Sequence, residues 1–377
     1  MTDAEADALF QTATGSPGNP YASANAEEFI QEAQRASGDL FTPRTRQAVR
    51  EVLDTGFGAL LIENLPVDPV LPETPRACGA LSPDYKRTFV SEFVSVALGA
   101  LVNAQIFNFR QEGRGSAPLF DNVVPIRELR SQRGAGGFAN NFPFHSESAW
   151  HRMRPDYVAL IGIRKAPDAK TLVCSITDIL DQELITNMPE DGYRLKPPQL
   201  YMQMEEQGIP LGTPFYRICP PIDARSDAAT VNVNLNGTDC LGRDALEWLA
   251  GFESVTESSA IAAVLEPGNA LILNNYRTCH TRTGFDPSFG PDARWFLRGN
   301  FKKNLWEGDP ASRQAFLRDV DLEMMADYGW ADGNGDLTTA FLPFIENPQQ
   351  LNALPASMRP LAAKALYLTP VPGSRIV

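Results

Sequence analysis

The feature that most constrains the fold is a succession of short strands from about residue 120 onward. Clusters of glycine, proline, asparagine and aspartate separate these strands, and such residues favour turns. The pattern favours a barrel or jelly roll, and its irregular alternation with helices disfavours a doubly wound parallel sheet. We therefore expect a mainly β protein with surrounding helices. The expected strands are Tyr157–Ile163, Thr171–Ile176, Phe215–Cys219, Val231–Leu235, Ala270–Asn274 and Arg294–Phe301.

Helical spacing of apolar residues predicts several helices before and between these strands. Pro43–Leu53 is stopped by Gly56, and Tyr85–Val102 is introduced by Ser82–Asp84, which offers an N-cap with proline just inside. The expected helices are Ala26–Ala36, Pro43–Leu53, Tyr85–Val102, Ile176–Asn187, Asp244–Phe252 and about Arg313–Asp327. Further strands are expected at Phe57–Leu65 and Ile106–Arg110.

We expect a single domain over residues 1–377, since length is only a soft guide to domain number. Residues 1–20 are polar and end in a run of glycine, serine, proline and asparagine, so we expect loose packing there. The core is expected at about 120–303, with inserted lid or loop segments, and a C-terminal helical region at 304–377.

Composition excludes several classes of partner and location. Hydrophobic residues make up 43% of the chain, which predicts a globular core, and the net charge of −13 disfavours nucleic acid as a partner. The five cysteines form no C-x-x-C pair, so we expect a cytoplasmic protein without a disulfide framework. The acidic N-terminus does not resemble a signal peptide, and the apolar stretches are too short to cross a membrane.

Two of the three histidines in the chain, together with a glutamate, form a pattern that suits a metal. His145 and Glu147 follow Pro143, which disfavours a helix, and in an extended backbone they point to the same face. His280 stands just after the apolar strand Ala270–Asn274. Two imidazoles and one carboxylate with open positions are the ligand set of non-haem iron(II) oxygenases.

A second alternation follows in the strand that begins at Arg294. Arg294, Phe296 and Arg298 would share one face, and burying two arginines without carboxylates is costly. A dicarboxylate cosubstrate and an acidic group of the substrate would satisfy both.

The same residues could instead have structural roles or hold a different metal. The histidines could be core residues, and Arg294 could hold a structural ion pair. A zinc hydrolase site could use two histidines and a glutamate, although the His-Glu-x-x-His helix motif is absent. His151 could be a ligand instead of a residue near the site, and Cys279 could be a soft ligand instead of a buried residue.

At these residues the chain resembles the clavaminate synthase-like group of iron(II)/2-oxoglutarate-dependent oxygenases, and the resemblance covers most of the chain. The matching stretches are Gly58–Ile62, Pro66–Pro69, Pro72–Pro75, His145–Glu147, Arg154–Val158, His280–Arg282 and Arg294–Arg298. The resemblance implies a double-stranded β-helix, which is a distorted jelly roll, with helices packed outside.

The resemblance also implies cofactors and the residues that bind them. His145, Glu147 and His280 match the iron ligands. Arg294 matches the arginine that binds the distal carboxylate of 2-oxoglutarate, and Thr171 matches a threonine near that carboxylate. The remaining cosubstrate of such enzymes is O2.

Substrate residues are implied in the same way. Arg298 matches an arginine that meets the substrate carboxylate, and Glu147 often also faces the substrate amino group in such enzymes. Relatives often carry a serine where this chain has Ala135, and relatives acting on arginine present acidic residues near Cys219, where the nearest acid is Asp223. These departures disfavour arginine as the substrate.

The expected function is therefore hydroxylation of an unactivated carbon of an L-amino acid or amino-acid derivative in specialised metabolism, such as antibiotic biosynthesis. Desaturation or cyclisation by the same site is an alternative, because hydrogen abstraction is shared. A non-catalytic jelly-roll binding protein is an alternative from another class. The expected partner is a small molecule, with neither nucleic acid nor a membrane, and the oligomeric state is left open.

Overall fold

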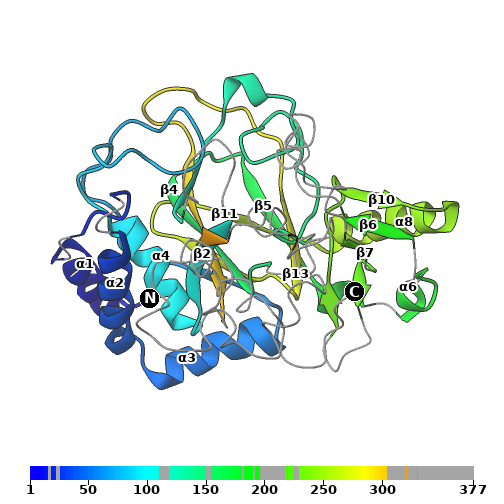
Figure 1. The fold of residues 1–377 in the computed structure, drawn as a ribbon, viewed down its shortest axis with the longest axis horizontal. Helices are drawn as coiled ribbons and strands as arrows, with labels where there is room; N and C mark the ends of the chain where they lie inside the picture. Colours follow the sequence, from blue (N-terminus) through cyan, green and yellow to red (C-terminus); the bar gives the residue numbers. More distant parts are fainter. Residues whose placement is uncertain are drawn as a thin grey trace.

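Antiparallel sheets with helices around them form the described part of the protein (Figure 1). The computed structural model describes residues 1–15, 18–22, 26–109, 119–149, 154–180, 182–189, 192–195, 217–218, 220–223, 229–303, 319–320 and 329. The expectation of a mainly β protein with surrounding helices is confirmed at this level.

The largest sheet has the strand order β1-β12-β4-β14-β2-β15, and β3 pairs with β14 beside β2. All of its pairs are antiparallel except that of β15 with β2. Its strands are β1 (Ala59–Ile62), β2 (Gln105–Phe109), β3 (Asp121–Val123), β4 (Tyr157–Arg164), β12 (Ala270–Asn274), β14 (Trp295–Lys302) and β15 (Asp319–Val320). The sheet is thus built from strands far apart in the sequence.

A second sheet has the order β11-β5-β13, formed by β11 (Ile261–Val264), β5 (Lys170–Ser175) and β13 (Thr278–Arg282). Smaller sheets pair β6 (Tyr193–Leu195) with β7 (Arg217–Ile218) and β10 (Thr238–Cys240), and β8 (Ile222–Asp223) with β9 (Thr230–Val231). They lie near α8 (Arg243–Ser259), on the right of Figure 1.

Strand β4 shows how the layers are stacked, because both of its faces are buried. Tyr157, Ala159 and Ile161 pack into a core with the N-terminal helices, whereas Val158 and Leu160 pack into another core with Val173 of β5. A continuous apolar run is the pattern of a strand covered on both faces. The protein therefore has a helical layer, the large sheet and the second sheet in that order.

The helical layer begins at the N-terminus, within the segment 1–20 for which loose packing is expected. Residues Asp3–Gly15 form helix α1, whose Leu9 and Ala13 are buried. These residues are four apart, so they lie on one helical face and pack against the apolar core. The helices that follow are α2 (Ala26–Leu40), α3 (Pro43–Arg50) with a π-helical turn η1 (Glu51–Thr55), and α4 (Val90–Leu101).

Helix α4 starts at Val90 and not at Tyr85 as predicted. Its first amide groups are capped from elsewhere in the chain: Val90 N–H donates to Asp68 Oδ1 at 3.0 Å, and Ser91 N–H donates to Asp68 Oδ2 at 3.2 Å. A carboxylate satisfies the unpaired donors of a helix N-terminus and complements its dipole. The local Ser-Pro-Asp pattern therefore did not set the start of the helix; a tertiary contact with Asp68 did, and no local pattern could indicate it.

The same carboxylate belongs to a fully buried charge cluster. Lys86 Nζ lies 2.9 Å from Asp68 Oδ2 and 2.7 Å from Glu92 Oε2, with all three side chains inaccessible to solvent. Tyr21 donates to Glu92 Oε1 at 2.6 Å, and its hydroxyl accepts from Asn122 Nδ2 at 3.1 Å. The cluster thereby ties the helical layer to strand β3.

Other local predictions differ in extent. The helix predicted at 176–187 is two short helices, α5 (Ile176–Ile179) and α6 (Gln182–Thr186), because Leu180 leaves the helical conformation. Most of the predicted C-terminal helical region, 304–377, lies outside the described residues. Within it, Asp319–Val320 form a strand and not a helix, because they pair with the edge of β2.

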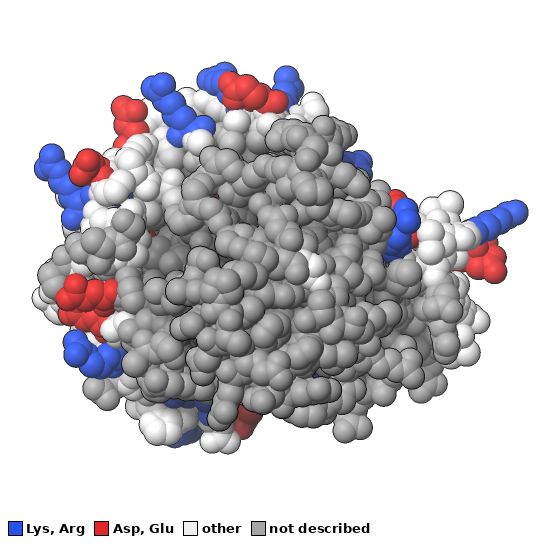
Figure 2. All heavy atoms as spheres, in the orientation of Figure 1, with Lys and Arg blue, Asp and Glu red and all other residues white. Residues whose placement is uncertain are grey.

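The molecular surface carries charges of both signs. Along the upper edge of the face in Figure 2, basic and acidic side chains are interspersed in the part that the structure describes. Within the described residues, no helix is both long enough and apolar enough to cross a membrane.

We predict that Asp68→Ala destabilises the protein strongly. The substitution removes the acceptor at the start of α4 and one of the two carboxylates that compensate Lys86. Breaking a buried pair by removing one partner costs about 3–5 kcal/mol, and urea unfolding measures it. The matched control is Glu266→Ala, which breaks a half-exposed pair with Lys165 and should cost below about 1 kcal/mol. A similar small loss for both variants would contradict the prediction.

Candidate metal centre

The segment that carries the first two predicted ligands lies in the sheet as an irregular strand. His145 N–H donates to His280 O at 3.0 Å, and His280 N–H returns a bond to His145 O at 2.9 Å. On its other side, Ser146 N–H donates to Val233 O at 2.7 Å. The extended backbone expected after Pro143 is present as far as Ser146, where it lies directly beside β13, and Glu147 begins a turn.

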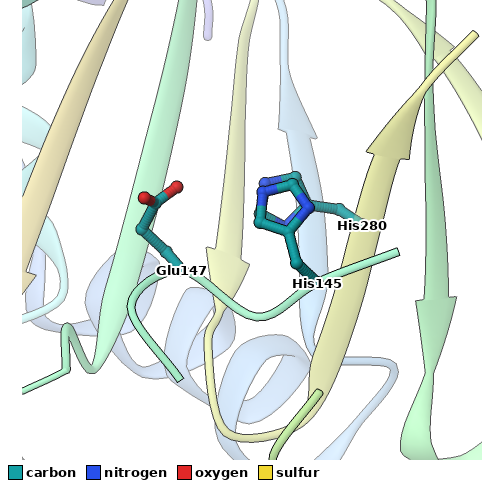
Figure 3. Close-up of side chains that lie close together, drawn as sticks. All are labelled: His145, Glu147 and His280. Carbon is teal, nitrogen blue, oxygen red and sulfur yellow. The ribbon is translucent and has the colours of Figure 1, made fainter. Parts of the chain in front are cut away.

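This pairing brings three side chains together. One ligand atom from each of His145, Glu147 and His280 lies within 4.8 Å of those of the other two. Figure 3 shows His280 projecting from its strand and the other two from the crossing segment. Both histidines are buried and Glu147 is partly buried. The arrangement has the donor types and the spacing that a small metal ion requires.

The histidines are prepared for coordination by their surroundings. His145 Nδ1 lies 2.9 Å from Pro143 O, and because a carbonyl only accepts, Nδ1 carries the proton and leaves Nε2 free. Burial lowers the pKa of His145, although Glu147 opposes this shift. Burial also holds the pKa of His280 well below its usual value, with the charges of His145 and Arg298 acting in the same direction. Both imidazoles are therefore neutral at neutral pH, which is the form that binds metals.

Glu147 is held through its backbone and its side chain. Its N–H donates to Asn275 Oδ1 at 2.7 Å, and Asn275 Nδ2 returns a bond to Glu147 O at 2.9 Å. Arg298 Nη1 donates to Glu147 Oε2 at 2.8 Å, which leaves Oε1 for a metal. The role of Asn275 was not predicted, since nothing near it in the sequence distinguishes it from a turn residue.

Arg298 is itself paired with two carboxylates. Its Nη2 and Nε donate to Asp121 Oδ2 at 2.6 and 3.2 Å, in addition to its bond with Glu147. Burial alone would lower the pKa of Arg298, but Glu147 and Asp121 outweigh it and raise that pKa. Asp121 faces Arg298 because the two are register partners in the pairing of β3 with β14. Sequence reasoning missed Asp121, since only this pairing brings it to the site.

Arg294 and Arg282 have the opposite environment. Both are buried, and among the described residues neither forms an ion pair with a carboxylate. Burial, with a contribution from Arg282, lowers the pKa of Arg294 to about 9, and burial lowers that of Arg282 to about 10. Their guanidinium carbons lie 5.5 and 5.3 Å from the centroid of the same ring, Phe285. An aromatic face offsets only about 2 kcal/mol of the cost of a buried cation.

The three candidate ligands and the three arginines line one cavity between the large sheet and the second sheet. Its lining residues are Val123, Ala135, Phe142, His145, Glu147, Leu160, Thr171, His280, Thr281, Arg282, Arg294, Phe296 and Arg298. The alternation predicted for β14 is present, because Arg294, Phe296 and Arg298 face this cavity while Trp295 and Leu297 lie in the helical-side core. A larger surface hollow beside α8 and β10 contains none of these groups.

One predicted substrate residue, Asp223, is not brought to this cavity. Asp223 lies on β8, where it pairs with Thr230, and it is absent from the cavity lining within the described part of the chain. Cys219 and His151 lie outside the described residues. Cys279, which could have been a soft ligand, is fully buried in a separate core beside Cys174.

Known proteins resemble the chain along most of its length. It is 26% identical to L-asparagine oxygenase of Streptomyces coelicolor, over 64% of this chain and 70% of the relative. It is 23% identical to enduracididine beta-hydroxylase of Streptomyces hygroscopicus, over 79% and 92%. It is 27% identical to clavaminate synthase 2 of Streptomyces clavuligerus, over 64% and 73%. No protein-family model matches it.

A solved structure shows the shared fold. The crystal structure of asparagine oxygenase in complex with Fe(II), 2S,3S-3-hydroxyasparagine and succinate aligns with a TM-score of 0.68 at 21% identity, covering 89% of this chain and 97% of that chain. Together with the sequence relatives, it confirms the predicted resemblance to the clavaminate synthase-like oxygenases.

We predict opposite effects on stability for substitutions of Arg298, which lies in β14, and of Arg294, which directly precedes β14. In the protein without metal or ligands, Arg298→Met leaves Asp121 and Glu147 without their cation, which should lower the free energy of unfolding by about 3–5 kcal/mol. Arg294→Met removes a buried charge that no described carboxylate compensates, so stability should stay equal or rise. Urea unfolding of both variants measures the difference, and equal losses would contradict it.

Proposed function

We propose that this protein is an iron(II)- and 2-oxoglutarate-dependent oxygenase that uses O2 to hydroxylate an unactivated carbon of an L-amino acid or amino-acid derivative. The observation that carries the proposal is the His145–Glu147–His280 cluster in one cavity with the guanidinium of Arg294, which pairs with no carboxylate of the described residues. The relatives support the reaction class, since they are named as oxygenases and hydroxylases of amino acids and as clavaminate synthase.

The residues fit iron(II). His145, Glu147 and His280 would hold it and leave positions open, as a two-histidine, one-carboxylate set does. Bound iron would supply the activation of O2, with 2-oxoglutarate as the source of electrons. The protein keeps both imidazoles neutral, and Arg298 orients Glu147 by occupying one of its oxygens. Preorganised groups of this kind act without reorganisation at the moment of reaction.

Arg294 and Thr171 would bind the far carboxylate of 2-oxoglutarate. Arg294 presents a planar fork that matches a carboxylate, and the dicarboxylate would bring the counter-charge that the described part of the chain does not provide. Thr171 is buried and lines the same cavity, where its hydroxyl would donate to that carboxylate. The keto acid end of 2-oxoglutarate would then be available to the iron that His145, Glu147 and His280 would hold.

The cluster of Arg298, Asp121 and Glu147 suits a different group. It holds one cation and two carboxylates in contact, so it presents donors and acceptors side by side. The head group of a free amino acid is a zwitterion and needs both. We propose that Arg298 binds the substrate carboxylate and that Glu147 faces its amino group.

The substrate side chain would meet a mainly apolar surface. Val123, Leu160, Phe142 and Phe296 line the cavity, and within the described residues Glu147 is the acid that does so. Ala135 lines it as well, at the position where relatives often carry a serine. A guanidinium there would lack its own counter-charge, so a neutral or smaller side chain is favoured.

The finer features of the fold follow the same proposal. We propose that the two stacked sheets are the halves of a distorted jelly roll and that the chain forms one oxygenase domain; the antiparallel pairing supports this. We also propose a cytoplasmic location, supported by the free thiols of Cys78, Cys174, Cys240 and Cys279.

We predict that His145→Ala or His280→Ala abolishes iron retention and turnover while the fold survives, because each removes a ligand from the cluster. Metal content after gel filtration and the visible band formed by anaerobic iron(II) with 2-oxoglutarate measure the loss, and circular dichroism checks the fold. His151→Ala is the matched control and should retain both metal and band. Full activity in both cluster variants, or loss in the control, would overturn the ligand set.

We predict poor coupling with free L-arginine. Its guanidinium would be buried beside apolar residues, which disfavours productive binding. Succinate release and product mass over a panel of L-amino acids measure the coupling; arginine should give far fewer hydroxylated products than succinates, and a neutral side chain should couple better. Stoichiometric hydroxylation of arginine would show that an acid outside the described cavity lining fills the role.

A further inference from the structure

Arg282 occupies a position that the proposed function leaves unexplained. It lies on β13 two residues after His280, so both side chains project from the same face of the strand. Its register partner across the sheet is Thr171, and directly opposite residues have neighbouring side chains. Arg282 therefore lies at the Thr171 end of the cavity, on the strand that also supplies a metal ligand.

The guanidinium of Arg282 is only partly hydrogen-bonded by the residues that the structure describes. Its Nη1 donates to Thr283 O at 2.8 Å and approaches Phe138 O at 3.5 Å. Its Nη2 is buried and has no hydrogen-bond partner in the part of the chain that the structure describes. A buried donor without a partner is costly, so a ligand acceptor at this place would be bound favourably.

Arg294 faces the same place. Both guanidinium groups lie beside the ring of Phe285, and both line the cavity without a described carboxylate between them. Two like charges in a buried site repel each other, and a bound anion relieves the repulsion and the desolvation together. By contrast, Arg298 already pairs with Asp121 and Glu147, so among the described residues the positive charge without a carboxylate partner is concentrated at the Arg282–Arg294 end of the cavity.

We infer that Arg282 is a second guanidinium that binds the far carboxylate of 2-oxoglutarate, acting with Arg294. This inference rests on the proposed function and deepens it. Arg294 would provide one fork and Arg282 the unused Nη2 donor, so the carboxylate would be held from two sides. This pair of arginines would also select a dicarboxylate over a keto acid that lacks the second charge.

The test compares two keto acids that share the metal-binding end. 2-Oxoglutarate carries the far carboxylate and 2-oxobutyrate lacks it. The iron(II)-loaded protein is titrated without oxygen with each, and the visible band reports the dissociation constants. In Arg282→Met, which removes the charge and keeps the volume, the constant for 2-oxoglutarate should rise about ten- to a hundred-fold, as expected for a lost charge-assisted bond. The constant for 2-oxobutyrate should stay within about threefold.

Matched variants complete the experiment. Arg294→Met should show the same selective loss, and Arg282→Lys, which keeps the charge without the fork, should fall between wild type and Arg282→Met. Arg277→Met is the control, since Arg277 precedes β13 and donates to Gly56 O outside the cavity. It should change neither constant. If Arg282→Met does not fold, Arg282→Lys decides by the same ratio of constants.

The outcomes separate the two proposals. Equal weakening of both keto acids in the Arg282 variants would show a purely structural role, and unchanged binding of 2-oxoglutarate would show no role; either result overturns this inference alone. Failure of wild type to form the band with 2-oxoglutarate would instead overturn the proposed function on which the inference rests.

Discussion

The reciprocal backbone hydrogen bonds between His145 and His280 are the contact on which the candidate site depends. They place the segment before Glu147 beside β13, although the two are far apart in the sequence. The imidazoles then lie with their ring centroids 4.4 Å apart, and Glu147 follows two residues later, at the start of a turn. Main-chain bonds of this kind hold ligands more rigidly than a loop would, which a preorganised metal site requires.

Charge divides the cavity into two ends. At one end Arg298 is compensated by Asp121 and Glu147, and at the other end Arg282 and Arg294 have no described carboxylate. The first end suits a zwitterion and the second end suits an anion. The same physical rule applies at both ends: a buried charge needs a partner, and the lack of one among the described residues is the basis for proposing an anion at the Arg282–Arg294 end.

The helical layer contributes to this division from outside the cavity. Asn122 accepts from Trp295 Nε1 at 2.9 Å and donates to Tyr21, which contacts the buried Lys86–Glu92 pair. Its neighbour Asp121 points the other way, to Arg298. Alternation along a short strand therefore connects a structural charge cluster on one face with the proposed substrate end on the other.

Local sequence patterns were sufficient to predict those elements whose signal lies in a few neighbouring residues. Ala270–Asn274 forms a strand over the predicted range, and Arg294, Phe296 and Arg298 share the predicted face, because alternation is a property of any extended backbone. The spacing of His145 and Glu147 indicated a metal site for the same reason. The predicted start of α4 and the helix predicted across Asp319–Val320 were wrong, because long-range capping and strand pairing decided these elements. Strand register and turns, and not any local pattern, bring to the site Asp121, Asn275 and Arg282. The sequence by itself determined which chemistry the chain carries, since ligand types and alternation are local. Only the tertiary structure decided which charges are compensated, since that depends on partners brought together across the sheets.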